Sequence, residues 1–118
     1  MDENLIRKKS YKFGLRIVKL NKHLKKEFKE YVMSNQILRA GTSIGANAYE
    51  AKYAQSRADF VAKMSISLKE ASETQYWLDI LYDSEYLSES QYKSLKTDVV
   101  EIIKMLTSAI NTTRSNGL

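Results

Sequence analysis

Apolar residues recur at steps of three and four along nearly the whole chain, and the sequence contains no proline that would interrupt a helix. This spacing is typical of helices that each bury one face, and no stretch has the period of two expected of a strand. The four successive stripes are Ile6, Ser10, Phe13, Ile17, Leu20, Leu24 and Phe28; Ile37, Gly41, Ile44, Ala48 and Ala51; Phe60, Met64, Leu68, Ala71, Gln75, Leu78 and Tyr82; and Tyr92, Leu95, Val99, Ile102, Leu106 and Ala109. Because the connections are short, we predict an all-α, antiparallel up-and-down four-helix bundle in which residues 1–118 form a single domain.

Serines with helix-capping character mark where the last two helices begin. Ser56 is followed by Asp59, and Ser88 by Gln91, each at the three-residue spacing of a capping box. The end of the first helix has no such signal, since neither glycine nor proline stands in residues 24–34. We expect that helix to end somewhere in this range.

The composition limits the kinds of site that the chain can form. There is no cysteine, which excludes disulfides and thiolate metal ligands and fits a reducing compartment. No apolar run approaches the ~20 residues needed to cross a bilayer, so we expect a cytoplasmic protein with no membrane contact. His23 is the only histidine, which excludes the paired Glu-x-x-His motifs of di-iron bundles. We therefore expect no metal site and no cofactor.

Positive charge is concentrated in the first third of the chain. Residues 1–40 contain eleven lysines or arginines against four acids, whereas residues 41–118 contain eight against ten. Five of these cations share the side of the first predicted helix that lies opposite its apolar stripe: Lys8, Lys12, Arg16, Lys19 and Lys26. We predict that they contact the phosphate backbone of RNA or DNA, without dependence on base sequence, because no platform of aromatic residues for base stacking is evident beside them. The alternative is a protein-interaction module whose basic face only keeps it in solution.

The segment "RAGTSIGANAYEA", residues 39–51, is unusually rich in small residues for a helix. A phosphate-binding loop needs glycines followed by lysine and serine or threonine after a strand, whereas Gly41 and Gly45 stand four apart within a helical pattern. Residues four apart share one helical face, so these glycines form a shallow groove that a neighbouring helix can approach closely. We therefore interpret the segment as a packing surface, and expect Gly45→Leu or Ala48→Leu to overpack the bundle.

A polar stripe runs beside this groove: Arg39, Ser43, Asn47 and Glu50. If the second and third helices pair about a turn near Gln55, Arg39 lies opposite Glu70 and Glu73. Two interpretations follow, a polar functional site or a partly buried Arg–Glu pairing that sets the register of the two helices. We favour the structural pairing, since buried ion pairs are better indicators of specificity than of stability.

Residues 36–81 also resemble a known family. The motifs that carry the resemblance are "GTSIGAN" at 41–47, "EA" at 50–51, "AQS" at 54–56, "LKEA" at 68–71, "ET" at 73–74 and "YWL" at 76–78. Together they resemble the signature of the four-helix bundle proteins encoded in 23S rRNA intervening sequences of bacteria. Tyr49 departs from the pattern, in which an acid or polar residue is common, and this difference leaves the expected fold unchanged.

The resemblance implies partners but no catalytic residues. Proteins of this family are similar to the accessory variability protein of diversity-generating retroelements, a basic pentameric barrel of four-helix bundles that associates with nucleic acid and a reverse transcriptase. By resemblance, this chain would form a homo-oligomer, with a pentamer favoured. It would associate with nucleic acid and with a protein partner such as a reverse transcriptase.

Apolar residues outside the main stripes also favour self-association. They are Ile66, Trp77 and Ile80 in the third predicted helix and Val100, Ile103 and Ile110 in the fourth. A single bundle of this size would leave part of this surface exposed to water, and exposed apolar patches commonly mark interfaces. We therefore predict a homo-oligomer.

One enzymatic interpretation has to be considered. Arg16 and His23 are seven residues apart, two turns along one helical face, and resemble the Arg–His motif of HEPN-type ribonucleases. In such an enzyme the arginine would hold a phosphate and the histidine would act on the 2′-hydroxyl. Many helices meet this spacing by chance, so we expect a non-enzymatic protein in which His23 faces solvent.

Overall fold

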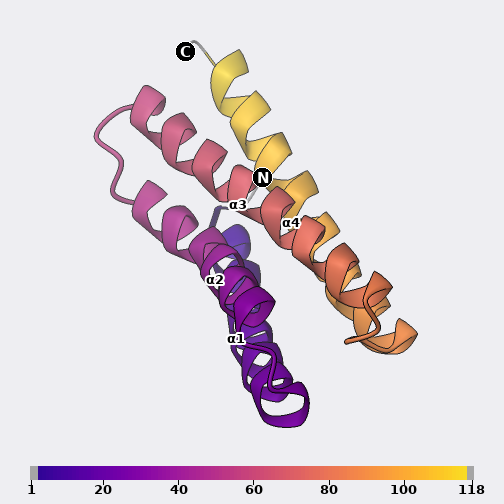
Figure 1. The fold of residues 1–118 in the computed structure, drawn as a ribbon. Coiled ribbons are helices and arrows are strands. Elements are labelled where there is room, and N and C mark those ends of the chain that lie inside the picture. Colours follow the sequence, from indigo (N-terminus) through magenta and orange to yellow (C-terminus); the bar gives the residue numbers. More distant parts are fainter. Residues whose placement is uncertain (1–2, 117–118) are drawn as a thin grey trace.

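The structure is a computed structural model and describes residues 3–116. Four α-helices with short connections make up this part of the chain. The helices are α1 (Glu3–Phe28), α2 (Val32–Ala51), α3 (Arg57–Asp83) and α4 (Glu89–Ser115). They run in alternating directions, with the α2–α3 connection at one end and the other two connections toward the opposite end (Figure 1). The predicted all-α, antiparallel four-helix bundle is confirmed.

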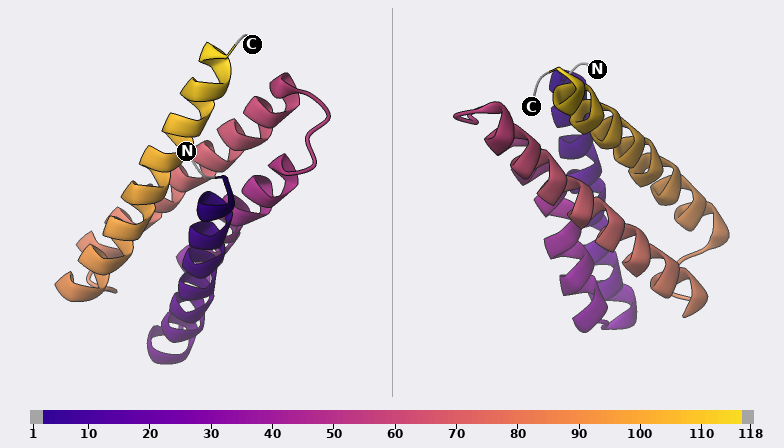
Figure 2. Two further views of the ribbon diagram at one scale, coloured as in Figure 1. Left: turned by 180° about the vertical axis from the view of Figure 1, so that it is seen from behind. Right: turned by 90° about the horizontal axis from the view of Figure 1, so that it is seen from above.

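The bundle consists of two helical hairpins, α1–α2 and α3–α4, which pack against each other mainly through α2 and α3. The views in Figure 2 show that the two hairpins cross at an angle instead of lying parallel. Because of this crossing, α1 touches α4 along a shorter seam than the other neighbouring helices share. The molecule is elongated, with extents of 49 × 21 × 19 Å.

A hydrophobic core shared by all four helices contains most of the predicted stripes of α1, α2 and α4. Phe28 is an exception: it is exposed where α1 ends, and its ring meets the Tyr86 ring edge-on at 5.3 Å. Ile110, which we expected outside the main stripe of α4, is buried in the core. Among the described residues, no helix is both long and apolar enough to cross a membrane.

The buried face of α3 differs from the predicted one by a rotation of the helix. Its buried residues are Val61, Met64, Ser67, Glu70, Ala71, Thr74, Leu78 and Leu81. The predicted stripe residues that lie only half-buried at its edge are Phe60, Leu68, Gln75 and Tyr82. The difference arises because polar side chains stand on the buried face, where their hydroxyls donate to backbone carbonyls, as Ser67 does to Ile44 at 2.7 Å. A search of the sequence for apolar residues alone does not identify these buried polar positions.

Side-chain caps define the N-termini of α3 and α4. Ser88 and Gln91 form the predicted capping box: Ser88 Oγ accepts from the Gln91 amide at 3.1 Å, and Gln91 Oε1 accepts from the Ser88 amide at 2.9 Å. Ser56 Oγ likewise accepts from the Asp59 amide at 3.0 Å. The Asp59 carboxylate, however, accepts from the Gln55 amide at 3.1 Å and so completes only half of the expected box.

The turn between α1 and α2 explains why the sequence showed no stop signal there. Lys29 adopts a left-handed conformation with φ of 52°, and the Glu30 amide donates to the Leu24 carbonyl at 3.2 Å, as in a glycine-terminated helix. The Glu30 carboxylate then accepts from the amides of Met33 and Ser34 at 3.1 and 2.8 Å. A lysine and a glutamate thus end α1 at Phe28, within the predicted range, and begin α2.

The small residues of α2 face α1, as the packing interpretation requires. A Cβ atom at Gly41 would lie 2.8 Å from both γ-carbons of Ile17, closer than carbon atoms pack in proteins. At Gly45 a Cβ atom would meet the backbone of Ser10 at 3.4 Å, an ordinary contact. Close approach of α1 therefore depends on the absence of a side chain at Gly41 more than at Gly45.

Candidate nucleic-acid interface

The predicted basic stripe lies on the side of α1 that faces away from the core. Four of its members are exposed: Lys8, Lys12, Lys19 and Lys26. Within residues 3–116 none of these four forms an ion pair, so their ammonium groups are available to anions. The fifth member, Arg16, stands at the edge of the stripe and is partly buried against α4.

Arg16 belongs to a polar seam that joins α1 to α4. Its Nη1 donates to Asp98 Oδ2 at 2.7 Å, and its Nη2 donates to Ser94 Oγ at 2.9 Å. Two turns toward the N-terminus of α1, Lys9 Nζ lies 2.5 Å from Glu101 Oε1. Both cations are therefore neutralised by acids of α4, and Arg16 connects α1 with α4, the neighbouring helices that share the shortest seam.

His23 lies in the same groove as Arg16, which the sequence spacing predicts. This groove of about 280 Å³ lies between α1 and the N-terminal part of α4, where Leu87 and Gln91 also line it. The imidazole is exposed and meets the Phe28 ring edge-on at 5.9 Å. The structure thus brings the two residues to one groove, but it holds the Arg16 guanidinium on Asp98 and Ser94.

The polar stripe of α2 lies against α3, and its arginine makes the predicted pairs. Arg39 Nη1 donates to Glu70 Oε2 at 2.9 Å, and Arg39 Nη2 donates to Glu73 Oε2. Glu73 Oε2 also accepts from Trp77 Nε1 at 3.1 Å. Glu70 is 7% exposed, whereas half of the Arg39 side chain remains exposed, so a buried acid is compensated by a cation at the rim.

The other members of this stripe bond mainly to their own helix. Ser43 Oγ donates to the Arg39 carbonyl at 2.6 Å, and Asn47 Nδ2 donates to the Ser43 carbonyl at 2.8 Å. Glu50 instead pairs with Lys63 of α3 at 3.1 Å. Of the four members, Arg39 and Glu50 therefore connect α2 with α3, whereas Ser43 and Asn47 bond to carbonyls within α2.

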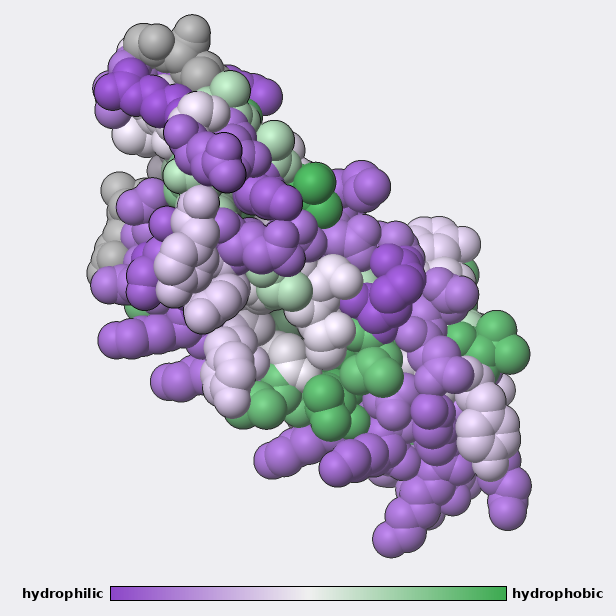
Figure 3. All heavy atoms as spheres, turned by 90° about the vertical axis from the view of Figure 1, so that its left-hand side faces the viewer, coloured by the Kyte–Doolittle hydropathy of each residue, from purple (hydrophilic) through white to green (hydrophobic). Residues whose placement is uncertain are grey.

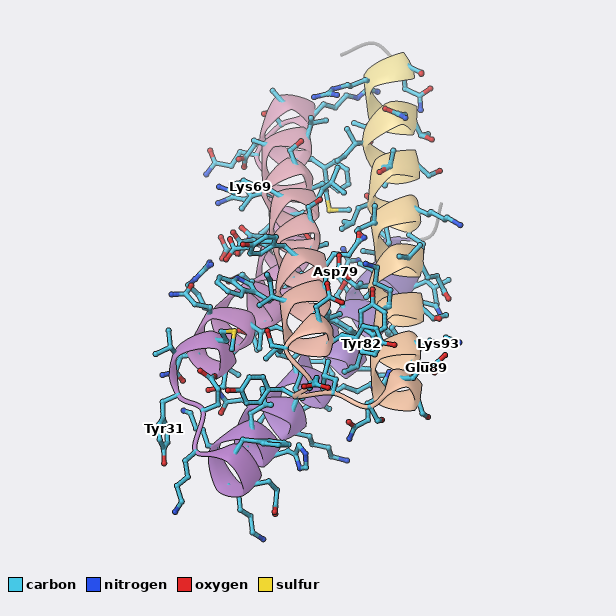
Figure 4. All side chains as sticks on the ribbon, turned by 45° about the vertical axis from the view of Figure 1, so that its right-hand side comes forward. Tyr31, Lys69, Asp79, Tyr82, Glu89 and Lys93 are labelled. Atoms are coloured by element: carbon cyan, nitrogen blue, oxygen red, sulfur yellow. The ribbon has the colours of Figure 1, made fainter. Side chains whose placement is uncertain are left out.

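A polar cluster between α3 and α4 was not found from the sequence. Tyr92 and Lys96 both donate to Asp79 Oδ1, at 2.6 and 2.5 Å, and the Tyr82 ring stacks on the Tyr92 ring at 4.3 Å. Figure 4 shows Asp79 between the two helices, whereas Lys69 points away from α3. The cluster could have been predicted from the register of the α3–α4 hairpin. A turn centred near Glu85 places Asp79 opposite Tyr92.

The protonation of this cluster follows from its hydrogen bonds. Partial burial acts to raise the pKa of Asp79, but the hydrogen bonds from Lys96 and Tyr92 outweigh it and lower the pKa below its ordinary value. Burial likewise opposes the charge on Lys96, and its bond with Asp79 still raises the Lys96 pKa. The pair therefore stays ionised near neutral pH and connects α3 to α4.

The fold and the surface together define a small all-α bundle protein with a basic first helix. Over the described residues, no group of three or more histidines, cysteines or acids could hold a metal ion. The polar clusters within the bundle, at Arg39 and at Asp79, connect neighbouring helices.

Comparison with known proteins assigns the family. The model described as 23S rRNA-intervening sequence protein matches residues 2–108, and the chain belongs to this family. A crystal structure of a protein with unknown function from the S23 ribosomal protein family of Bacteroides thetaiotaomicron is similar, with 55% sequence identity and a TM-score of 0.92. The similarity covers 94% of this chain and 99% of that chain. A comparison with curated proteins found no match.

Proposed function

We propose that the exposed lysines of α1 bind the phosphate backbone of RNA or DNA, and that the protein is a non-enzymatic scaffold or accessory factor of nucleic acid. This proposal rests on the observation that only some of the cations of α1 are paired with acids. Lys9 and Arg16 are paired with acids of α4, while the four exposed lysines of the stripe have no ion pair in the described part of the chain. A row of uncompensated cations on one rigid helix matches the regular charge of a nucleic-acid backbone.

Binding of this kind has a defined salt dependence. Each phosphate that a lysine neutralises releases condensed counterions, so the logarithm of the affinity falls linearly with the logarithm of the salt concentration. The slope is about −0.9 for each neutralised phosphate on duplex DNA and about −0.7 on single strands. Fluorescence anisotropy with labelled mixed-sequence RNA and DNA, measured over a series of salt concentrations, would give this slope.

A pair of charge-matched variants tests which lysines are responsible. The first double variant, Lys12→Glu with Lys19→Glu, reverses two charges of the α1 stripe. The second, Lys69→Glu with Lys104→Glu, makes the same change in net charge on the exposed surfaces of α3 and α4. Arg16 is left unchanged because its replacement would break the seam to Asp98. We expect the first variant to lose binding and the second to retain most of it. Equal losses would show that net charge alone attracts nucleic acid, and would contradict a site on α1.

Self-association would multiply these contacts. A hydrophobic patch surrounded by hydrophilic side chains lies on the side of the molecule that is to the left in Figure 1 (Figure 3). Ile66 of α3 is 40% exposed, although Trp77 and Ile103 pack against the core and leave less free apolar surface than the sequence suggested. We propose a homo-oligomer, with the pentamer that the family resemblance implies, in which each subunit presents one basic stripe. Sedimentation should show an oligomer that Ile66→Glu dissociates, and a wild-type monomer would refute it.

Two alternatives give different results in the same assays. A protein-interaction module would bind neither RNA nor DNA even at low salt, which would leave a protein partner, such as the reverse transcriptase that the resemblance implies, as the ligand. A ribonuclease would cleave RNA, and His23→Ala would abolish that cleavage while leaving the fold intact. The shared groove of Arg16 and His23 is the observation that makes this second assay worthwhile.

A further inference from the structure

Exposed tyrosines gather at the free end of the α1–α2 hairpin, where the N-terminal half of α1 lies beside the C-terminal end of α2. Tyr11 of α1 and Tyr49 of α2 line one groove of about 300 Å³, although they are 38 residues apart in the sequence. Their exposed fractions are 67% and 58%, and Tyr53, just beyond α2, is 62% exposed. Large aromatic side chains left in water at one place commonly mark a binding surface.

The groove between these tyrosines is lined by cations. Arg7, Lys8 and Lys12 come from α1, and Lys52 follows α2. Among residues 3–116 no acid lines the groove, and none of the four cations forms an ion pair. The surface therefore combines aromatic rings with uncompensated positive charge.

The rings of Tyr49 and Tyr53 are neighbours but do not stack face to face. The rings of Tyr49 and Tyr53 have centroids 5.7 Å apart and planes inclined by 59°, and Lys52 Nζ lies 5.7 Å from the Tyr53 centroid. A hydrogen bond with Tyr53 raises the pKa of Tyr49, so this phenol stays neutral and adds no negative charge near the cations. More than half of the Tyr11 and Tyr49 side chains is exposed, so a planar partner can reach either ring.

We propose that this surface is a single-strand nucleic-acid platform, on which bases stack on Tyr11 and Tyr49 while Arg7, Lys8, Lys12 and Lys52 contact the adjoining phosphates. The inference rests on the proposed function and makes it more specific, because two of the backbone-binding lysines belong to the platform. It differs from the expectation that no aromatic platform is present, because the rings and cations come from two helices and meet only in the hairpin. Duplexes are disfavoured, since their bases are already stacked and cannot reach the rings.

Three labelled ligands of equal length separate stacking from phosphate contacts: a mixed-sequence single strand, its duplex, and an abasic strand that retains only the sugar-phosphate backbone. Fluorescence anisotropy at one low salt concentration gives the three affinities for the full-length protein. We expect the single strand to bind more tightly than both of the others. The loss of one stacked base reduces affinity by about 5- to 150-fold.

Matched variants then test the rings. Tyr11→Ala and Tyr49→Ala should each weaken single-strand binding within that range and leave the salt slope unchanged, while Tyr11→Phe and Tyr49→Phe should retain affinity because phenylalanine still stacks. Tyr31→Ala is the control: Tyr31 is also exposed but lies in the α1–α2 turn, at the opposite end of the hairpin, where its side chain points outward (Figure 4).

The possible failures are distinguishable. Equal binding of the three ligands, with no effect of the alanine variants, would overturn the platform and leave the backbone-directed function standing. No binding of any ligand at low salt would overturn both. If Tyr11→Ala or Tyr49→Ala instead shifts the sedimentation of the protein without changing affinity, the surface is a contact between copies and the proposal is wrong.

Discussion

Replacing Gly41 with alanine should destabilise the bundle, while the same replacement four residues later should not. Alanine is favoured over glycine within a helix by about 1 kcal/mol, and this gain is common to Gly41→Ala and Gly45→Ala. The two variants differ in what the new methyl group meets. At Gly41 it lies 2.8 Å from both γ-carbons of Ile17 and 3.2 Å from its Cβ, whereas at Gly45 it makes an ordinary contact at 3.4 Å.

The magnitude follows from how little Ile17 can move. This side chain is fully buried, and because both γ-carbons and Cβ face Gly41, rotation about χ1 cannot remove all three contacts. Relief therefore requires a shift of α1 relative to α2, and overpacking of this kind costs about 1–3 kcal/mol. Since the propensity gain cancels between the variants, Gly41→Ala should have a free energy of unfolding about 1–3 kcal/mol below that of Gly45→Ala.

Urea denaturation followed by circular dichroism would measure both free energies and show whether the m-values stay equal. Gly14→Ala serves as a second control, because a Cβ atom there has no neighbour within 4 Å and should give only the propensity gain. In an Ile17→Ala background the cost of Gly41→Ala should fall, because both γ-carbons are gone and only the Cβ contact at 3.2 Å remains. If Gly41→Ala is as stable as Gly45→Ala, or if the background makes no difference, close packing of α1 on Gly41 is not what requires the glycine.

Three further predictions concern polar groups. Arg39→Ala leaves the buried Glu70 carboxylate without its cation, and urea denaturation should show a free energy of unfolding about 1–3 kcal/mol lower. A double-mutant cycle with Glu70→Gln should show coupling, and strict additivity would exclude the pairing. Ser10→Ala should raise the free energy of unfolding by about 1 kcal/mol, since the buried Ser10 hydroxyl has no hydrogen-bond partner among the described residues, and a loss of stability would reveal a partner. Asp79 has a folded-state pKa below its ordinary 3.8, so its contribution to the free energy of unfolding is present above that value and is lost as the pH falls through the folded pKa. Asp79→Asn should therefore lower the free energy of unfolding by less than about 1 kcal/mol at neutral pH, and unfolding at acid pH should show no difference from the wild type.

Local spacing carried most of the information about the fold. The core faces of α1, α2 and α4 follow from the 3.6-residue helical repeat, and the capping box at Ser88 follows from a three-residue interval. The pairing of Arg39 with Glu70 and Glu73 could be predicted because a short turn sets the register of an antiparallel hairpin. Each of these features depends on residues near one another in the chain or related by a single turn.

The sequence by itself therefore determined four helices, their order and most of their buried faces. Only the tertiary structure decided the rotation of α3, since polar groups on its buried face are satisfied by backbone partners that an apolar pattern cannot show. The crossing of the hairpins likewise decided that Arg16 binds Asp98 while Lys12 stays exposed, although both belong to one sequence stripe. Tyr11 and Tyr49 meet for the same reason: positions far apart in the chain become neighbours only when helices pack, and the packing angle sets which side chains share a surface.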